Sequence, residues 1–377
     1  MIFRMLRFFA DSSRKSFPLT IESHFQMLKT SSYSPGTLPS IIKAFYHLYT
    51  DSKTYHTTIN WNSHPIIKSS INNMIPHLPN IENKYINSLI VSLGFMGIGP
   101  HPIWKQLEPL FLGGSYKEVE DFYVPYVITS FSVCKCQNPV LWQILNQKLI
   151  DNYLKTQTVS STTAVLTYKS LMLARQGSPA VLNQLKTVII NNMHEIRYSS
   201  ISGLLNAMSY NKQLDQDLAK PLIAKVMQDI DLIDASELSK ILGNLSLLVY
   251  DRKVCELIES KLMKKVNDLS FKDLVACFSL YCQKRSLLLE FPKNLFAHYM
   301  NKRLVLKSKV ENKDVIAVYD VKMLGSAIDM DIVMPDKFFL EIFEEIKKSK
   351  MNIGDSKTLQ ANYASVEKYK SFHKFKS

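Results

Sequence analysis

The chain contains few of the residues that make tight turns. Only 11 Gly and 15 Pro occur among its 377 residues, fewer than a sheet-rich protein of this size would need. The apolar fraction of 46% is ample for a hydrophobic core. These proportions favour a long, all-α fold.

Cysteine is scarce and lacks the spacing of a metal site. The five residues are Cys134, Cys136, Cys255, Cys277 and Cys282. None forms a CxxC pair, and a zinc site needs four ligands at tighter, paired spacing. We therefore expect reduced thiols in the core, a reducing compartment, no metal and no cofactor.

Motifs of catalysis are also missing. The segment 94–99 is rich in Gly but lacks the strand, turn and helix of a dinucleotide site, and there is no Walker loop, HExxH or nucleophile elbow. The nine His are scattered, and His64, His77 and His298 are expected to be structural. The sequence predicts a binding or scaffolding protein rather than an enzyme, with no small-molecule substrate.

No segment predicts a membrane span. Residues 85–104 are uncharged up to Trp104, but they include Asn, Ser, three Gly and Pro100, which are unsuited to a continuous apolar span. A buried helix followed by a turn explains this segment better.

What the chain does contain is a recurring apolar pattern. Clusters of apolar residues at helical spacing end at anchors 36 to 40 residues apart, namely Leu93, Phe131, Leu171, Met208, Leu245 and Tyr281. A period of this length is typical of stacked helical hairpins, each too small to bury its own apolar face. We predict an all-α solenoid of about six to eight helical hairpins with a period of 36–40 residues.

The two helices of each hairpin can be placed from this pattern. We call the first helix of a hairpin A and the second B. Pro102, Pro139 and Pro179 lie where B helices should begin, because proline is tolerated at the first helical position. The predicted pairs are 83–96 with 102–112, 120–136 with 139–154, 161–175 with 179–193, 199–210 with 216–228, 235–248 with 253–266, and 271–283 with 291–304.

The repeat period is irregular at both ends of the chain, as expected for terminal repeats that face water on one side. The predicted segments are a mitochondrial targeting segment at 1–20, an irregular N-terminal cap at 21–82, the array at 83–304, a degenerate hairpin at 305–350 and a basic aromatic tail at 351–377.

The A-helix pattern apolar-x-x-apolar-apolar-x-x-apolar, seen at 201–208 and 238–245, resembles the heptatricopeptide and octotricopeptide families and the related FAST-kinase-like helical region. The resemblance covers about residues 83–304. It implies an organellar protein that acts on RNA. Members of those families often end in a small nuclease-like domain, but no strand pattern or acidic cluster is present at this C-terminus.

Charge points to an anionic partner. The formal net charge is +13, and a polyanion such as RNA is the partner that such a charge attracts most readily. The candidate RNA contacts are the B-helix cations and the lysines of the tail, which are interleaved with aromatic residues: Lys148, Lys186, Lys225, Lys261, Lys264, Lys265, Lys302, Arg303, Lys368, Lys370, Lys374 and Lys376.

Two simpler readings stay open for these cations. Cations near the C-terminal end of a helix are favoured by the helix dipole without any ligand, which suits Lys264, Lys265, Lys302 and Arg303. The tail could equally be a solvated segment.

The first twenty residues favour import into mitochondria. They carry four basic residues against one acid, Asp11, together with serines and an apolar complement, which is typical of a transit peptide. The targeting residues are Arg4, Arg7, Arg14 and Lys15. An ordinary amphipathic first helix is the alternative.

Two functions follow from the sequence. The first is a non-catalytic RNA-binding protein of the mitochondrial matrix, associated with the mitochondrial ribosome or with RNA processing and stability, whose partners are organellar rRNA or mRNA and other proteins of a ribonucleoprotein assembly. The second is a lineage-specific scaffold subunit of a respiratory-chain or ATP synthase assembly, which would bind protein rather than RNA.

Overall fold

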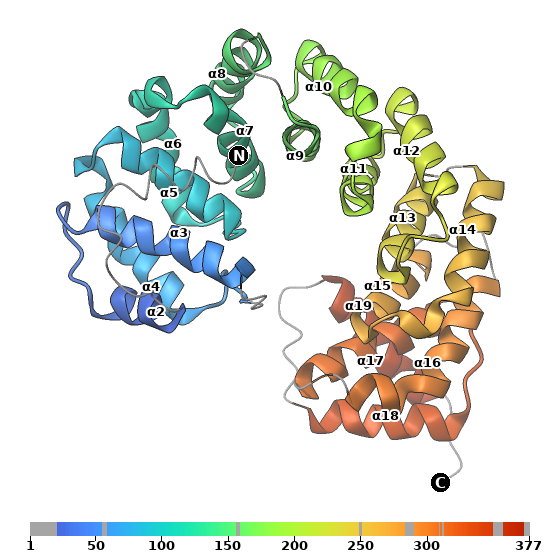
Figure 1. The fold of residues 1–377 in the computed structure, drawn as a ribbon. Coiled ribbons are helices and arrows are strands. Elements are labelled where there is room, and N and C mark those ends of the chain that lie inside the picture. The colour runs from blue at the N-terminus through green and yellow to red at the C-terminus, as the bar shows by residue number, and fades with distance from the viewer. Residues whose placement is uncertain are drawn as a thin grey trace. The chain divides into compact units, whose positions relative to one another are not determined.

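The fold is seen in a computed structural model, which describes residues 21–54, 59–155, 159–248, 251–282, 290–308, 310, 313–349 and 357–372. Within these ranges every regular element is a helix (Figure 1). The prediction of an all-α fold is confirmed. Among the described helices, none has both the length and the apolar character that a bilayer crossing requires.

The chain forms two compact units, residues 1–192 and 193–377, so the division falls inside the segment predicted as a single array. Each unit is described by itself. The helices of unit 1 are α2 (Ile21–Thr30), α3 (Leu38–Thr54), α4 (Pro65–Met74), η1 (Ile75–Asn80), α5 (Asn83–Phe95), α6 (Pro102–Gly113), η2 (Ser115–Glu118), η3 (Asp121–Tyr123), α7 (Val124–Val133), α8 (Pro139–Lys148), the π-helical η4 (Leu149–Leu154), α9 (Ser161–Ala174) and α10 (Pro179–Asn191).

Unit 2 continues the alternation of helices. Its elements are η5 (Met193–Glu195), α11 (Tyr198–Asn211), α12 (Gln216–Gln228), α13 (Ala235–Leu247), α14 (Arg252–Lys264), η6 (Val266–Asp268), α15 (Phe271–Cys282), α16 (Glu290–Ser308), α17 (Lys313–Asp329), α18 (Asp336–Lys348) and α19 (Lys357–Phe372).

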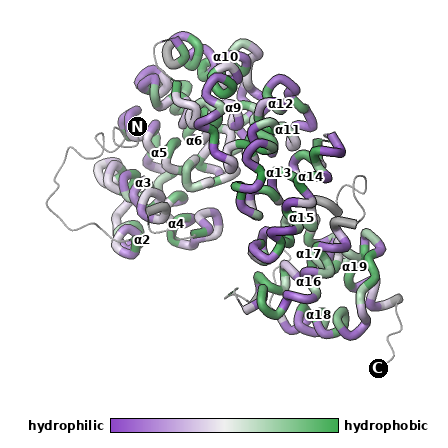
Figure 2. The backbone as a smooth tube through the Cα atoms, turned by 45° about the vertical axis from the view of Figure 1, so that its right-hand side comes forward, coloured by the Kyte–Doolittle hydropathy of each residue, from purple (hydrophilic) through white to green (hydrophobic). Residues whose placement is uncertain are grey.

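Within each unit the A helices pack on one another in chain order. In unit 1 the series is α3, α5, α7 and α9, and in unit 2 it is α11, α13, α15, α17 and α19. From α5 onward each B helix packs on the A helix before it. Apolar and polar residues alternate along these helices in Figure 2, and the apolar ones form the buried seam.

The predicted anchors lie in this seam, where four of them also mark helix ends. Leu93, Phe131, Leu171, Met208 and Leu245 are fully buried. The carbonyl groups of the first four each accept a hydrogen bond from the amide five residues later, at 2.9 to 3.1 Å. This is the Schellman arrangement that closes a helix C-terminus. The sixth anchor, Tyr281, lies in α15 among residues whose side chains the structure does not describe.

Small residues let consecutive A helices approach closely. A Cβ atom added at Gly94 in α5 would lie 2.0 Å from Ser130 Oγ and 2.5 Å from Ser130 Cα in α7. Between α7 and α9, Ser132 Oγ donates to the Ser170 carbonyl at 2.8 Å, and Ser170 Oγ donates to Thr129 Oγ1 at 3.0 Å. The buried hydroxyls are therefore satisfied by the neighbouring helix.

Two terminal segments differ from their predictions. The segment expected as an irregular cap contains α2, the 17-residue α3 and α4. Helix α4 is short and exposes several Ser and Asn residues, which read as a loop, yet Ile67, Ile71 and Met74 are buried on one face. The segment expected as a basic tail contains α19, which packs on α17 and buries Leu359 and Val366.

Replacing Gly94 by Ala should destabilise unit 1, because the methyl group would meet the α7 backbone and force α5 and α7 apart. We expect a loss of about 1–3 kcal/mol of unfolding free energy, measured as a lower urea midpoint by circular dichroism. Gly113→Ala is the matched control, since no atom lies within 4 Å of its added Cβ. Equal midpoints for the two variants would contradict the close approach.

Candidate nucleic-acid interface

The predicted cations of α8 and α12 make intramolecular contacts. Lys148 Nζ donates to the Val119 carbonyl at 3.2 Å. Lys225 lies 3.6 Å from the Asp229 carboxylate and over the ring of Tyr198. Lys186, in α10, is half-buried. These contacts are within the protein, so part of the predicted set of B-helix cations is already engaged in helix packing.

Two of the three lysines at the end of α14 also make contacts within the protein. Lys261 Nζ pairs with Asp231 Oδ1 at 2.7 Å. Lys265 Nζ donates to the carbonyls of Asp231 and Ile233 at 2.8 and 2.6 Å. Lys264 is exposed. Of these three cations, Lys264 is the one left on the surface for a phosphate.

Arg303 is the clear correction to the predicted interface. Its side chain is only 2% exposed, and its guanidinium makes two hydrogen bonds to Asp320, at 3.0 and 2.6 Å, and one to Glu345 at 2.7 Å. Tyr299 also donates to Asp320 at 2.7 Å. Burial raises the pKa of Asp320, and the hydrogen bonds from Arg303 oppose that effect. Arg303 therefore organises the core of unit 2 and is not accessible to RNA.

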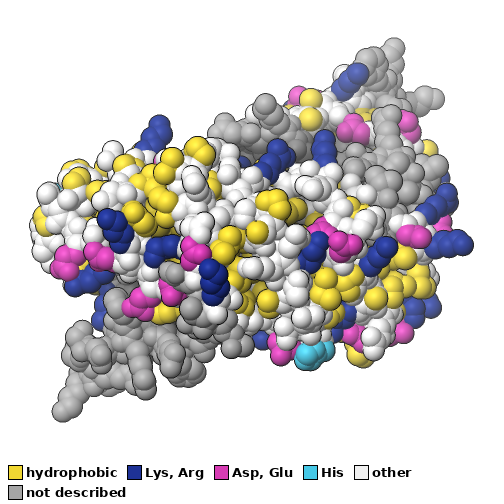
Figure 3. All heavy atoms as spheres, turned by 90° about the horizontal axis from the view of Figure 1, so that it is seen from above, with side chains coloured by type: hydrophobic (Ala, Val, Ile, Leu, Met, Phe, Trp, Pro, Cys, Tyr) yellow, Lys and Arg dark blue, Asp and Glu magenta, His cyan; other side chains and the backbone are white. Residues whose placement is uncertain are grey.

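The remaining predicted residues have mixed positions. Lys302 and Lys368 are exposed. Lys370 lies 3.3 Å from Glu344 and over the ring of Phe343. The other predicted contacts, Lys374 and Lys376, and the targeting residues Arg4, Arg7, Arg14 and Lys15 lie outside the described residues. On the face drawn in Figure 3, the visible basic side chains stand singly among acidic and apolar ones rather than in one patch.

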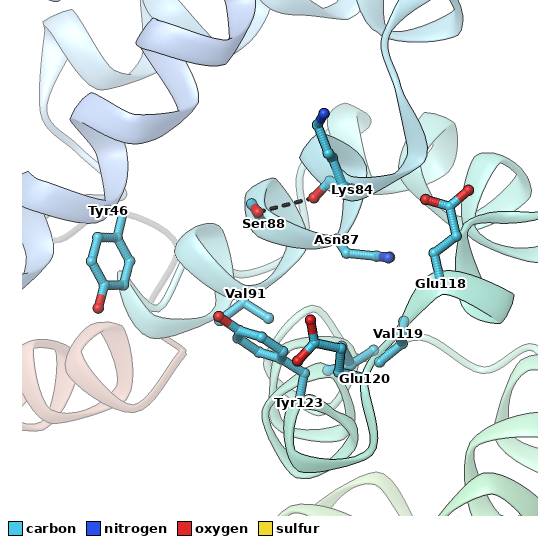
Figure 4. A pocket seen from close by; sticks show the side chains of 10 residues that line it. Tyr46, Lys84, Asn87, Ser88, Val91, Glu118, Val119, Glu120 and Tyr123 are labelled. Atoms are coloured by element: carbon cyan, nitrogen blue, oxygen red, sulfur yellow. Dashed lines mark hydrogen bonds between the residues drawn. The ribbon is translucent and has the colours of Figure 1, made fainter. Parts of the chain in front are cut away.

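A small pocket opens in unit 1 between α3, α5 and the segment before α7 (Figure 4). Its lining includes Tyr46, Lys84, Glu120 and Tyr123. Burial, aided by nearby Tyr46 and Glu120, raises the pKa of Tyr123 to about 12. The cavity volume of about 50 Å³ suits a few water molecules rather than a ligand.

The described thiols are buried and unreactive. Burial raises the pKa of Cys134 and Cys136 to about 12, so the nucleophilic thiolate is disfavoured. Among the described residues, no three His, Cys, Asp or Glu side chains gather as metal ligands.

Sequence reasoning missed the turns that join A to B helices in unit 1. In these turns, or in the first helical turn after them, lie four exposed cations, one in each of four successive hairpins: Lys68, Lys105, Lys135 and Arg175. The signal was available, because residues 60–68, 97–105, 134–142 and 175–183 contain no Asp or Glu.

No protein-family model matches the chain, and no curated protein matches it with significant similarity.

Replacing Asp320 by Asn should strongly destabilise unit 2, since Arg303 would keep its charge in a buried site without a full counter-charge. Breaking a buried pair costs about 3–5 kcal/mol. Glu367→Gln, which removes the half-exposed partner of Lys347, should cost less than about 1 kcal/mol. Urea unfolding followed by circular dichroism compares the two. A similar, small effect of both would mean that the Asp320 pair is not what holds this core.

Proposed function

We propose that the chain is a non-catalytic RNA-binding protein built from stacked helical hairpins with a period of 36–40 residues. It acts in the mitochondrial matrix, as part of the ribosome or of an RNA-processing or stability assembly. The proposal rests on the charge balance and on the stacking of A helices within each unit. The composition of the N-terminal segment favours the mitochondrion as the compartment. The resemblance of the A-helix pattern to organellar RNA-binding families favours organellar RNA as the partner.

The observation that carries the proposal is the excess of positive charge. The chain has 46 Lys and Arg against 33 Asp and Glu. An ion pair brings opposite charges together but removes neither, so the pairs found at Lys225, Lys261 and Arg303 leave the excess of 13 unchanged. A surface with this excess attracts a polyanion and releases its counterions on binding.

The full chain should bind fluorescent single-stranded RNA with a steep dependence on salt. If about four phosphates are contacted, the log-log slope is about −3, and the affinity falls about 50-fold between about 50 and about 200 mM salt. Fluorescence anisotropy measures this directly.

A polyglutamate peptide of similar charge is the control ligand. RNA should bind more tightly, because bases can stack where a peptide carboxylate cannot. Absence of RNA binding at low salt, or equal binding of the two polymers, would contradict the RNA function and leave a protein-binding scaffold as the better reading.

Import should depend on the basic residues of the first segment. In the full-length protein, replacing Arg4 and Arg7 by Glu should abolish mitochondrial localisation, because transit peptides must be basic and poor in acids. Replacing Lys374 and Lys376 by Glu makes the same charge change at the other end and should leave localisation intact. Microscopy of tagged full-length chains measures both. Unchanged localisation of the first variant would rule out the targeting role.

A further inference from the structure

One edge of unit 1 carries more cations than acids. The edge is formed by the four turns between A and B helices, and we call it the basic edge. It carries the exposed residues Lys68, Lys105, Lys135 and Arg175. None of the B helices α4, α6, α8 and α10 has an acidic residue in its first turn.

Polar contacts hold these turns side by side. Asn62, in the first turn, donates to the Gly97 carbonyl at 2.8 Å and accepts from the Gly99 amide at 3.1 Å in the second. Lys105, beside the second turn, lines the same cavity as Cys134 and Cys136 of the third.

The third and fourth turns are joined by one side chain of α8. Asn146 Nδ2 donates to the Gln176 carbonyl at 2.8 Å, and Asn146 Oδ1 accepts from the Ser178 amide at 3.1 Å. The turns therefore follow one another at the separation of packed helices, about 8–10 Å.

The acids of unit 1 nearest this edge have partners. Glu108, in α6, accepts from Asn138 Nδ2 at 2.6 Å and from Cys136 Sγ at 3.1 Å. Asp51, near the end of α3, lies 3.2 Å from His24 Nε2. Most other acids of unit 1 lie in or beside the opposite turns, between B and A helices: Glu82, Glu118, Glu120, Asp121 and Asp151.

Helix electrostatics do not account for the basic edge. Lys68 and Lys105 follow the first residue of their B helices by three positions, near the positive end of the helix dipole, where a cation is disfavoured. Lys135 and Arg175 lie at A-helix ends with φ of 59°. Glycine is the residue that adopts this left-handed conformation without steric cost.

Unit 2 provides an internal contrast. Its first two A-to-B turns also carry exposed cations, Lys212, Arg252 and Lys253. Their B helices are capped by carboxylates, however, since Asp215 accepts from the Leu218 amide and Asp251 from the Lys253 amide. In unit 1 the corresponding caps are the neutral side chains of His101, Asn138 and Ser178.

A cavity of about 390 Å³ opens on the basic edge between the second and third turns. Its lining combines Lys105, His101 and Glu108 with the rings of Trp104 and Phe131. The Glu108 carboxylate is held by Asn138 and Cys136. Both burial and nearby Lys68 lower the pKa of His101, so this ring is neutral near pH 7. The space accepts a flat, uncharged ring beside a cationic side chain.

We propose that the basic edge of unit 1 is the RNA-docking surface of the chain. Lys68, Lys105 and Lys135 contact the phosphates of a single strand that runs along this edge. An unstacked base enters the cavity beside Lys105. This assignment rests on the proposed RNA function and places the contacts at the A-to-B turns and the first turn of the following helices, rather than on the cations predicted from the sequence.

The test compares two triple variants of the full chain that remove equal charge. Lys68→Ala, Lys105→Ala and Lys135→Gly together weaken the basic edge, and Gly keeps the left-handed turn. Lys212→Gly, Arg252→Ala and Lys253→Ala are the matched control in unit 2. For RNA binding, we expect the first variant to lower the log-log salt slope by about 2 and the affinity at least about tenfold, while the control stays within about twofold.

Photo-crosslinking of 4-thiouridine RNA to the wild-type chain gives a second measurement that needs no variant. Crosslinks are expected within residues 97–142, where the cavity lies. Crosslinks confined to residues 193–377, or equal losses in the two triple variants, would overturn the basic edge while leaving RNA binding intact. Failure of the wild-type chain to bind RNA would instead remove the proposed function and this assignment together.

Discussion

The close approach of consecutive A helices is the interaction on which the rest of the structure depends. Gly94 presents no side chain to α7, so Ser130 of α7 packs directly against the α5 backbone. The Ser132 and Ser170 hydroxyls bond across to the neighbouring helix. In unit 2, Asn244 does the same by bonding to the Ser202 carbonyl. This packing sets the distance between successive turns, and therefore the spacing of whatever the turns carry.

Sequence reasoning located the helices well where two local signals agreed. Proline at the first position fixed the starts of α6, α8 and α10, and the apolar anchors fixed the ends of α5, α7, α9 and α11. It missed α4, because a ten-residue helix with three buried apolar positions among Ser and Asn has too weak a period to detect. Packing on its neighbours, rather than propensity, makes that helix.

The site was harder to predict than the fold, because sequence gives a lysine's place on a helix but not the carbonyl or carboxylate that reaches it. Lys265 meets backbone carbonyls contributed from more than thirty residues away in the chain. Arg303 is the clearest example of a cation whose partner was not predicted, although the sequence contains a signal for that partner. Asp320 stands among Ile316, Ala317, Val321 and Leu324, all buried, and a carboxylate on an apolar face requires a buried cation.

The choice of capping residue carries the electrostatic difference between the two units. Helices α6, α8 and α10 of unit 1 begin after His101, Asn138 and Ser178, whereas α12 and α14 of unit 2 begin after Asp215 and Asp251. Asn, Asp and Ser cap helix N-termini about equally well. Helix stability alone therefore does not explain this difference between the units. A carboxylate cap in those unit 1 turns would add negative charge to this edge. Neutral caps retain the same hydrogen bonds and leave the positive potential of that edge in place.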